Sequence, residues 1–150
     1  MTAVLLSLHV LAAILAVGPV CVAASMFPPE ARRAATDPEA GARLRVLGRI
    51  CRAYAVIGIA VPVLGLATAL AMGVLTEAWV LVSIVLTAAA AGMLAGVVLP
   101  RQRALLEGTE PGSGVAALTG RLAGATGVFN LLWATVTVLM IVRPGSTTGV

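Results

Sequence analysis

The sequence predicts an all-α, polytopic membrane protein whose four transmembrane helices form one antiparallel bundle. Hydrophobic residues make up 60% of the 150 residues and charged residues only 11%, whereas soluble domains have about 25% charged residues. All ten basic residues are arginines, and nine of them lie in two short segments between apolar stretches, 32–52 and 101–121. Because a transmembrane helix needs about 20 apolar residues, a single domain of this length has room for four spans.

The first span is predicted at residues 3–27 and ends at Pro28-Pro29, because proline interrupts a helix. No basic residue precedes this apolar stretch, which is also too long for a signal peptide, so we expect the span to be retained. The segment Asp37-Pro38-Glu39 then predicts the start of a helix, with Asp37 as N-cap and Pro38 in the first helical position.

The second span is predicted at residues 53–75, after an amphipathic stretch with arginines between its apolar positions. Pro62 and three nearby glycines predict a kink near the middle of this span. The link Thr76-Glu77 is so short that spans two and three should form an antiparallel hairpin. Trp79 would then lie in the interfacial aromatic belt with its indole N–H in water.

The third span is predicted at residues 78–99, and its helix should continue past Pro100 to a C-terminal cap at Gly108. Small residues form a ridge on this span, which predicts it as the central packing helix rather than a dimer face. The ridge consists of Ala88, Gly92 and Gly96, and a second one of Gly120 and Gly124 lies at the entry of span four.

The fourth span is predicted at residues 122–142, with Ser113 as the cap of its helix and Arg143-Pro144 as its end. A shift of 72 residues aligns Pro28 with Pro100, Gly48-Arg49 with Gly120-Arg121, and Gly73 with Gly145. Identity between the halves is otherwise no better than chance for such a composition. One interpretation is coincidence, and the other is two parallel helical-hairpin repeats.

The long loops, 28–52 and 100–121, hold nine arginines against five acidic residues, so the positive-inside rule predicts that both are cytoplasmic. Both termini would then lie outside the membrane. The lysine-free, Ala/Val/Leu/Gly-rich composition is typical of a GC-rich bacterial genome, so we expect this membrane to be a bacterial inner (plasma) membrane. Aromatic residues amount to 3% and none is interleaved with the arginines, so we expect lipid head groups as partners and no nucleic acid.

Few polar side chains lie within the predicted spans, and none of the acidic or basic residues lies mid-span, which argues against proton-coupled drug efflux. His9 is the one ionisable candidate, either hydrogen-bonded to a neighbouring helix or an axial haem or metal ligand. A haem b with two histidine ligands would need a homodimer, because the chain has one histidine. The candidate ligand-binding residues are His9, Asn130, Thr68, Ser83, Thr87 and Thr135, with Thr137 at a similar depth.

Cys21 and Cys51 form no CxxC pattern or cluster with histidine, so we expect buried, unlinked thiols. For Asn130 the alternatives are a structural hydrogen bond within the bundle and contact with a ligand. Trp133 is interpreted as packing rather than as a cofactor wall.

Several short motifs resemble a known group. They are Leu8-His9-Val10-Leu11 with Gly18, residues 62–73, Trp79 and Leu99-Pro100-Arg101-Gln102-Arg103. Over nearly its whole length the chain resembles the bacterial "predicted integral membrane protein" family, a four-helix domain of unknown function. The Leu-His start is also similar to copper-resistance D proteins and four-helix protoporphyrinogen oxidases, a resemblance that implies a metal or haem site at His9. This chain lacks their second histidine and intramembrane lysine, which argues against an oxidase.

We therefore expect a non-enzymatic membrane protein that binds or transports a small or lipophilic ligand, or that acts as an accessory subunit. One alternative is a haem- or metal-binding protein that uses His9. Another is a purely structural subunit of a larger membrane complex.

Overall fold

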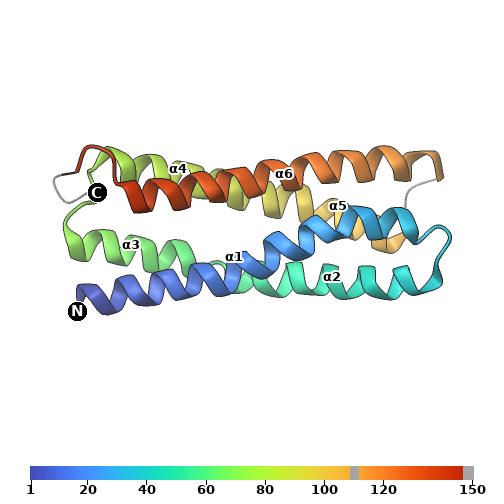
Figure 1. The fold of residues 1–150 in the computed structure, drawn as a ribbon, viewed down its shortest axis with the longest axis horizontal. Helices are drawn as coiled ribbons and strands as arrows, with labels where there is room; N and C mark the ends of the chain where they lie inside the picture. Colours follow the sequence, from blue (N-terminus) through green and yellow to red (C-terminus); the bar gives the residue numbers. More distant parts are fainter. Residues whose placement is uncertain (109–111, 147–150) are drawn as a thin grey trace.

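The computed structural model describes residues 1–108 and 112–146, which form an elongated bundle of helices with no β-strand in those ranges (Figure 1). The predicted all-α, four-helix fold is confirmed, and the chain is a multi-pass membrane protein. Four continuous or interrupted helices in the described residues are long and apolar enough to cross a membrane: Thr2–Arg33, Pro38–Met72, Ala78–Glu107 and Gly114–Val142.

Helix α1 (Thr2–Arg33) continues through Pro28 and Pro29, so the predicted end of the first helix at these prolines is wrong. A proline in a helix removes one donated hydrogen bond and strains the preceding turn. Here the side chains of Phe27, Pro28 and Ala31 are buried, and Phe27 packs in the main core with Leu44 and Leu47 of the next helix. This packing holds the segment helical despite its prolines.

Helix α2 (Pro38–Ile57) begins as predicted, since the Asp37 carboxylate accepts a hydrogen bond of 2.9 Å from the Glu39 backbone N–H. The predicted kink of this span is a break at Gly58-Ile59, one turn before Pro62, after which α3 (Ala60–Met72) begins. Pro62 has no N–H to donate to the Gly58 carbonyl. The Val61 N–H bonds to that carbonyl instead, at 3.1 Å.

Helix α4 (Ala78–Met93) is followed by a π-helical turn, η1 (Leu94–Val98), and by α5 (Leu99–Glu107). The turn precedes Pro100, and the Leu99 N–H reaches back five residues to the Leu94 carbonyl. Gly108, with φ +62°, caps α5 as predicted. Helix α6 (Gly112–Val142) ends directly before Arg143-Pro144, also as predicted. The predicted Ser113 cap lies outside the described side chains.

Helix α1 occupies the central position that the sequence assigned to the third span. It packs against α2, α3 and α6, starting beside α3 and crossing toward α5 and α6 (Figure 1). The ridge of Ala88, Gly92 and Gly96 is exposed, and no neighbouring atom lies within 4 Å of a Cβ built at either glycine. The prediction for span three is therefore wrong, because α4 and η1 bury the opposite face, which carries Ala90 and the larger side chains of Leu94 and Val98.

The bundle has two unequal halves. The arginine half contains the α1–α2 turn and the start of α6, and the terminal half contains the N-terminus, the end of α6 and the α3–α4 turn (Figure 1). The main core contains Phe27, Cys51 and Leu122, each 0% exposed. At the α3–α4 turn a smaller cluster contains Trp79, whose indole Nε1 is buried without a partner. The prediction that this N–H stays in water is wrong, because Met140 and Arg143 at the end of α6 cover the ring.

The two sequence halves agree in some details and differ in others. Gly73 and Gly145, aligned by the 72-residue shift, both have positive φ, at +68° and +83°. The helix irregularities do not correspond, since Gly58-Ile59 interrupts the second helix of the first half and η1 interrupts the first helix of the second half. The hairpin duplication stays a prediction.

Candidate functional site

The side chain of His9 lies half-buried against α3. Its Nδ1 is 3.0 Å from the Val61 carbonyl oxygen, and a carbonyl can only accept, so Nδ1 carries the proton and donates. In the neutral imidazole with this tautomer, Nε2 is the nitrogen that carries the free lone pair. Gly65 permits this approach, because a Cβ there would lie 2.9 Å from His9 Cε1. The hydrogen bond to a neighbouring helix is one of the two roles that the sequence predicts for His9.

Asn130 links α6 to α1 near the middle of the bundle. Its Nδ2 donates to Ser25 Oγ at 3.0 Å, whereas its Oδ1 is buried and has no hydrogen-bond partner among the described residues. A structural hydrogen bond between helices, one of the predicted alternatives, is therefore present. The amide oxygen can still accept a hydrogen bond, so the second alternative, contact with a ligand, stays open.

The neighbours of Asn130 on the same side of α6 share this property. Thr126 Oγ1 and Trp133 Nε1 are also buried without a partner in the described part of the chain. The spacing i, i+4, i+7 places all three on one helix face, which we name the α6 polar face (Thr126, Asn130, Trp133). Trp133 also packs edge-on against Phe129, with ring centroids 6.3 Å apart. Sequence reasoning missed Thr126 and interpreted Trp133 as packing, although the spacing alone could have grouped them with Asn130.

The predicted hydroxyl-bearing residues behave differently from Thr126. The hydroxyls of Thr68, Ser83 and Thr135 donate to backbone carbonyls four residues earlier, at 2.7, 2.7 and 2.8 Å. Thr137 does the same at 2.9 Å. Such bonds use the only donor of each hydroxyl. Thr87 is half-buried.

The predicted polar layer is therefore not assembled as one cluster. Within residues 1–108 and 112–146, no side-chain hydrogen bond joins any two of His9, Asn130, Thr68, Ser83, Thr87 and Thr135. The hydrogen bond of His9 leads to α3 and that of Asn130 leads to α1. Two separate polar positions remain, one at His9 and one at the α6 polar face.

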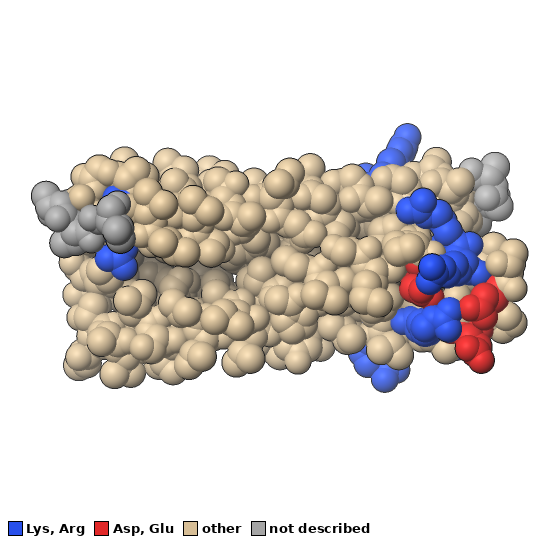
Figure 2. Space-filling view, viewed as in Figure 1, with Lys and Arg blue, Asp and Glu red and all other residues tan. Residues whose placement is uncertain are grey.

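The helices of the terminal half lie in two pairs. Helix α3 packs on α1, and α4 packs on α6. Figure 2 shows a furrow between these pairs on the visible face of the terminal half, whereas the arginine half is closed. Ser25, the partner of Asn130, is itself exposed on the surface. The contact between α1 and α6 can therefore be reached from the side of the bundle.

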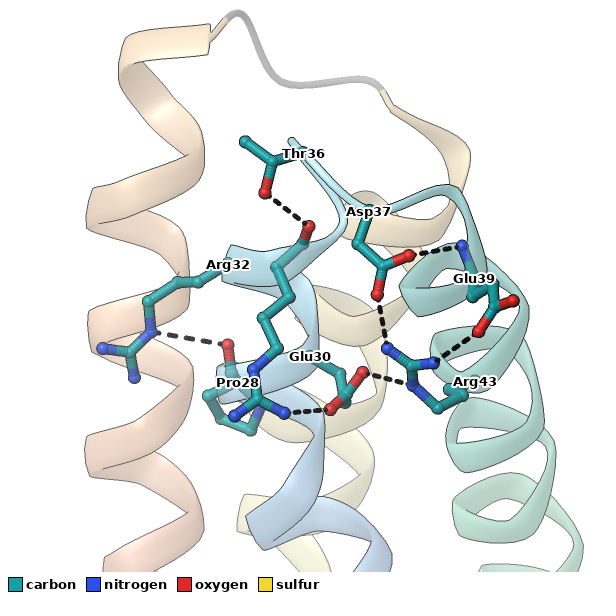
Figure 3. Close-up of polar contacts among 8 residues, drawn as sticks. Pro28, Glu30, Arg32, Thr36, Asp37, Glu39 and Arg43 are labelled. Atoms are coloured by element: carbon teal, nitrogen blue, oxygen red, sulfur yellow. Dashed lines mark hydrogen bonds and ion pairs between the residues drawn. The ribbon is translucent and has the colours of Figure 1, made fainter.

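Ion pairs in the arginine half join the turn between α1 and α2, as Figure 3 shows. Both oxygens of Glu30 are bound, by Arg33 Nη1 at 2.9 Å and by Arg43 Nε at 2.8 Å. Arg43 also donates to Asp37 Oδ2 at 2.7 Å and lies 3.6 Å from Glu39. The Arg43 hydrogen bond, followed by the Glu39 backbone N–H, holds the pKa of Asp37 below its usual value. This α1–α2 latch (Glu30, Arg33, Asp37, Glu39, Arg43) is fully paired, which suits a structural role.

The two cysteines are free thiols. Cys51 is fully buried, as predicted, and its Sγ accepts a hydrogen bond of 3.4 Å from Gln102 Nε2. Cys21 is only half-buried, since it lies at the margin of the main core. Gln102 is 2% exposed, and its Oε1 has no hydrogen-bond partner within residues 1–108 and 112–146. Its burial within a loop-proximal helix was not predicted.

The described residues contain no group of three or more His, Cys, Asp or Glu side chains that could hold a metal ion. Comparisons with protein-family models, with curated proteins and with solved structures give no match. The resemblance to four-helix membrane families stays a prediction, and the function has to be inferred from the residues themselves.

Proposed function

We propose that this protein binds a small, amphipathic or lipophilic ligand at the contact between α1 and α6, with the ligand's polar group at the α6 polar face. The observation that carries the proposal is the alignment of three buried, unpartnered polar atoms on one face of α6, Thr126 Oγ1, Asn130 Oδ1 and Trp133 Nε1. The face offers an indole donor, a hydroxyl and an amide acceptor. It can therefore bind a ligand that carries both donor and acceptor groups, such as an alcohol, an amide or a carbonyl compound with a hydroxyl.

The energetics favour a ligand over a purely structural role. A buried polar atom without a partner costs about 1–3 kcal/mol, and the hydrocarbon core of a membrane supplies no water to bind it. Apolar side chains of similar size would pack at these positions without this cost. Thr126 is especially informative, because the hydroxyls of Thr119, Thr135 and Thr137 on the same helix bond to their own backbone.

The ligand would enter sideways from the membrane. Ser25 is exposed beside Asn130, and the helix pairs of the terminal half separate along the furrow in Figure 2. The polar group would bind at Asn130 while an apolar tail follows the surface between the helix pairs. Binding in this way requires no charged group in the ligand, in agreement with the uncharged surroundings.

The test is mass spectrometry of the small molecules that co-purify with the detergent-solubilised protein. Asn130→Leu replaces the amide by an apolar group of similar size and should lose the bound molecule. Thr135→Val is the matched control, because it removes a hydroxyl of α6 that is already bonded to its own helix. Retention of the same molecules by Asn130→Leu, or their equal loss from Thr135→Val, would contradict the proposal.

A second candidate function is haem or metal binding at His9. The supporting observation is the hydrogen bond from Nδ1 to Val61, since metal-bound histidines commonly orient one nitrogen through such a bond and coordinate with the other. The chain has a single histidine, so a haem b with two histidine ligands would need His9 from two copies, and one copy would need a substitute ligand. Protein purified from a haem-replete host should then show a Soret band that His9→Ala abolishes. Colourless, metal-free protein would contradict haem or metal binding at His9.

We further propose that the protein lies in a bacterial inner membrane with both termini outside, on the basis of its arginine distribution. Single cysteines at Glu39 and Thr76, in a variant with Cys21 and Cys51 replaced by alanine, test the orientation. In intact cells an impermeant thiol reagent should label position 76 and leave position 39 unlabelled. The reverse pattern would invert the topology.

An accessory or purely structural role in a larger complex, or as a homodimer, is the remaining proposal. It is supported by the exposed ridge of Ala88, Gly92 and Gly96, because small residues allow close approach of a second helix in the membrane. Purification in a mild detergent decides this point. A protein that always elutes alone and monomeric would exclude both assemblies.

A further inference from the structure

A small groove between α2 and α5 combines positive charge with an unpaired buried acceptor. Two of its residues are arginines from different helices, and a third is the buried Gln102. The lining consists of Gly48, Arg52, Leu99, Gln102, Arg103 and Leu106. Gly48 sets the spacing of these helices, because a Cβ there would lie 2.8 Å from Leu106 Cδ1.

The groove lies at the boundary between the charged and the apolar parts of the bundle. Arg52 is the last charged residue before the uncharged stretch 53–76, and Arg101 is the first one after the uncharged stretch 78–100. Arg101 Nη1 also lies 3.3 Å from the Arg121 carbonyl oxygen, which brings the boundary of α6 to the same level. Figure 2 shows arginines at this level on the visible face. Phospholipid phosphates occupy this depth when the helices span a bilayer.

The two arginines of the groove have donors to spare. Arg52 is exposed and makes no hydrogen bond or ion pair within the described residues. Arg103 uses its Nε to bind Glu107 at 2.7 Å. Its two terminal nitrogens make no hydrogen bond or ion pair with the described residues. Guanidinium groups bind phosphate oxygens through paired, charge-assisted hydrogen bonds.

Gln102 adds chemical selectivity. It is 2% exposed, and its Oε1 has no partner in the described part of the chain. The cavity beside it has a volume of about 10 Å³, which is enough for one water-sized group. An amide oxygen accepts hydrogen bonds, so it disfavours a phosphate oxygen and favours a hydroxyl.

We propose that this groove binds the head group of an anionic, hydroxyl-bearing phospholipid, with the phosphodiester between Arg52 and Arg103 and a head-group hydroxyl donating to Gln102 Oε1. Phosphatidylglycerol has this chemistry. Phosphatidic acid provides the phosphate without the hydroxyl, and phosphatidylcholine provides neither net negative charge nor a hydroxyl. The site is distinct from the α6 polar face and does not depend on it.

The experiment is native mass spectrometry of the full chain, titrated in detergent with phosphatidylglycerol, phosphatidic acid or phosphatidylcholine. Wild type should bind them in that order of affinity. Arg52→Gln should weaken both anionic lipids about tenfold, the effect of losing one charge-assisted hydrogen bond. Arg45→Gln is the matched control, since Arg45 is an exposed arginine of α2 outside the groove, and it should leave both affinities unchanged.

Gln102→Leu should remove the preference for phosphatidylglycerol over phosphatidic acid while retaining the affinity for phosphatidic acid. Gln102→Met provides the same test with a flexible side chain if the leucine variant does not fold. Equal weakening by Arg45→Gln and Arg52→Gln would show a general basic surface and overturn the proposal. Binding of phosphatidylcholine as tight as that of phosphatidylglycerol, or an unchanged preference in the Gln102 variants, would also overturn it.

Discussion

The arginine half and the terminal half of the bundle use their polar groups in opposite ways. In the arginine half, charged side chains are paired in the α1–α2 latch or exposed at the lipid boundary, and the helices enclose a continuous core around Phe27. In the terminal half, the helix pairs separate, and the core is reduced to the small cluster around Trp79. Most hydroxyls there bond to their own helix.

The middle of the bundle differs from both halves. The α6 polar face groups three buried polar atoms that have no partner among the described residues, whereas Trp79 Nε1 and Gln102 Oε1, which also have none, lie apart on other helices. Charged groups therefore stabilise the α1–α2 turn, and the α6 polar face is where we propose that a ligand binds. The variants below test this division.

The largest effect is expected for Phe27→Ala in the main core. Phe27 is 0% exposed between α1 and α2, and truncation of a fully buried phenylalanine costs about 3–5 kcal/mol. Leu15→Ala on the same helix should cost far less, because Leu15 is 62% exposed. Thermal unfolding in detergent measures both. Equal losses would show that stability is not concentrated in the arginine half.

A smaller effect is expected for Gly48→Val, whose added methyl groups meet the side chains of Leu106 and Phe27 in the core. Such overpacking costs about 1–3 kcal/mol. The terminal-half counterpart is Gly65→Ala, which adds a single methyl whose three nearest atoms belong to the ring of His9 and should cost less. Chemical denaturation of the two variants compares them directly, and a larger loss for Gly65→Ala would contradict the comparison.

His9→Phe should cost about 1 kcal/mol or less, because it removes the single hydrogen bond to Val61 and retains a ring of similar size. Helix α3 is already interrupted at its start, so the lost bond should mainly loosen its contact with α1. Hydrogen exchange of the Ala60–Met72 amides would show this loosening. Exchange that increases equally in α5 would show that the two halves are coupled.

The smallest effect concerns pH and Asp37. The pKa of Asp37 is lower in the folded protein than the unfolded value of about 3.9. Its charge therefore stabilises the fold above that value, and this contribution is lost as the pH falls through the folded pKa. Asp37→Asn retains a good N-cap but loses the charge that pairs with Arg43.

The difference in melting temperature between wild type and Asp37→Asn should therefore shrink as the pH is lowered from 6 to 3. Comparing the two proteins cancels the contributions of Glu30 and Glu39. A difference that stays constant over this range would show that the Asp37 charge contributes nothing.

Much of the fold could be predicted because its signals are local. Apolar stretches, arginine segments and the caps at Asp37 and Gly108 each act within a few residues, and all four helices were predicted from them. The continuation of α1 through Pro28 could not be, because it depends on burial of Phe27 against a helix that follows the turn. The prediction that Gly92 and Gly96 lie in a packing face of the bundle was also wrong, since small residues permit close packing without requiring it.

The candidate site was predicted in part. His9 and Asn130 were singled out because such polar side chains are rare within the predicted spans, and both make contacts between helices. The hydroxyls of Thr68, Ser83 and Thr135 gave the same polar signal, yet they bond to their own backbone. Whether a hydroxyl has a partner depends on its rotamer and its neighbours, which composition and spacing do not determine. Thr126 and Trp133 were recognised only in the structure, where the hydroxyl and the indole nitrogen are buried without a hydrogen-bond partner among the described residues.

The fluorescence of Trp133 provides the most direct test of the α6 polar face as a binding site. In a Trp79→Phe background it is the only tryptophan, and its indole Nε1 has no protein partner in the described residues. Removal of co-purified small molecules by detergent exchange should shift its emission maximum, and adding the extract back should restore it. The same treatment of Asn130→Leu in that background should give no shift. In Trp79→Phe alone, which retains Asn130, an emission maximum that does not change would contradict ligand binding at the α6 polar face.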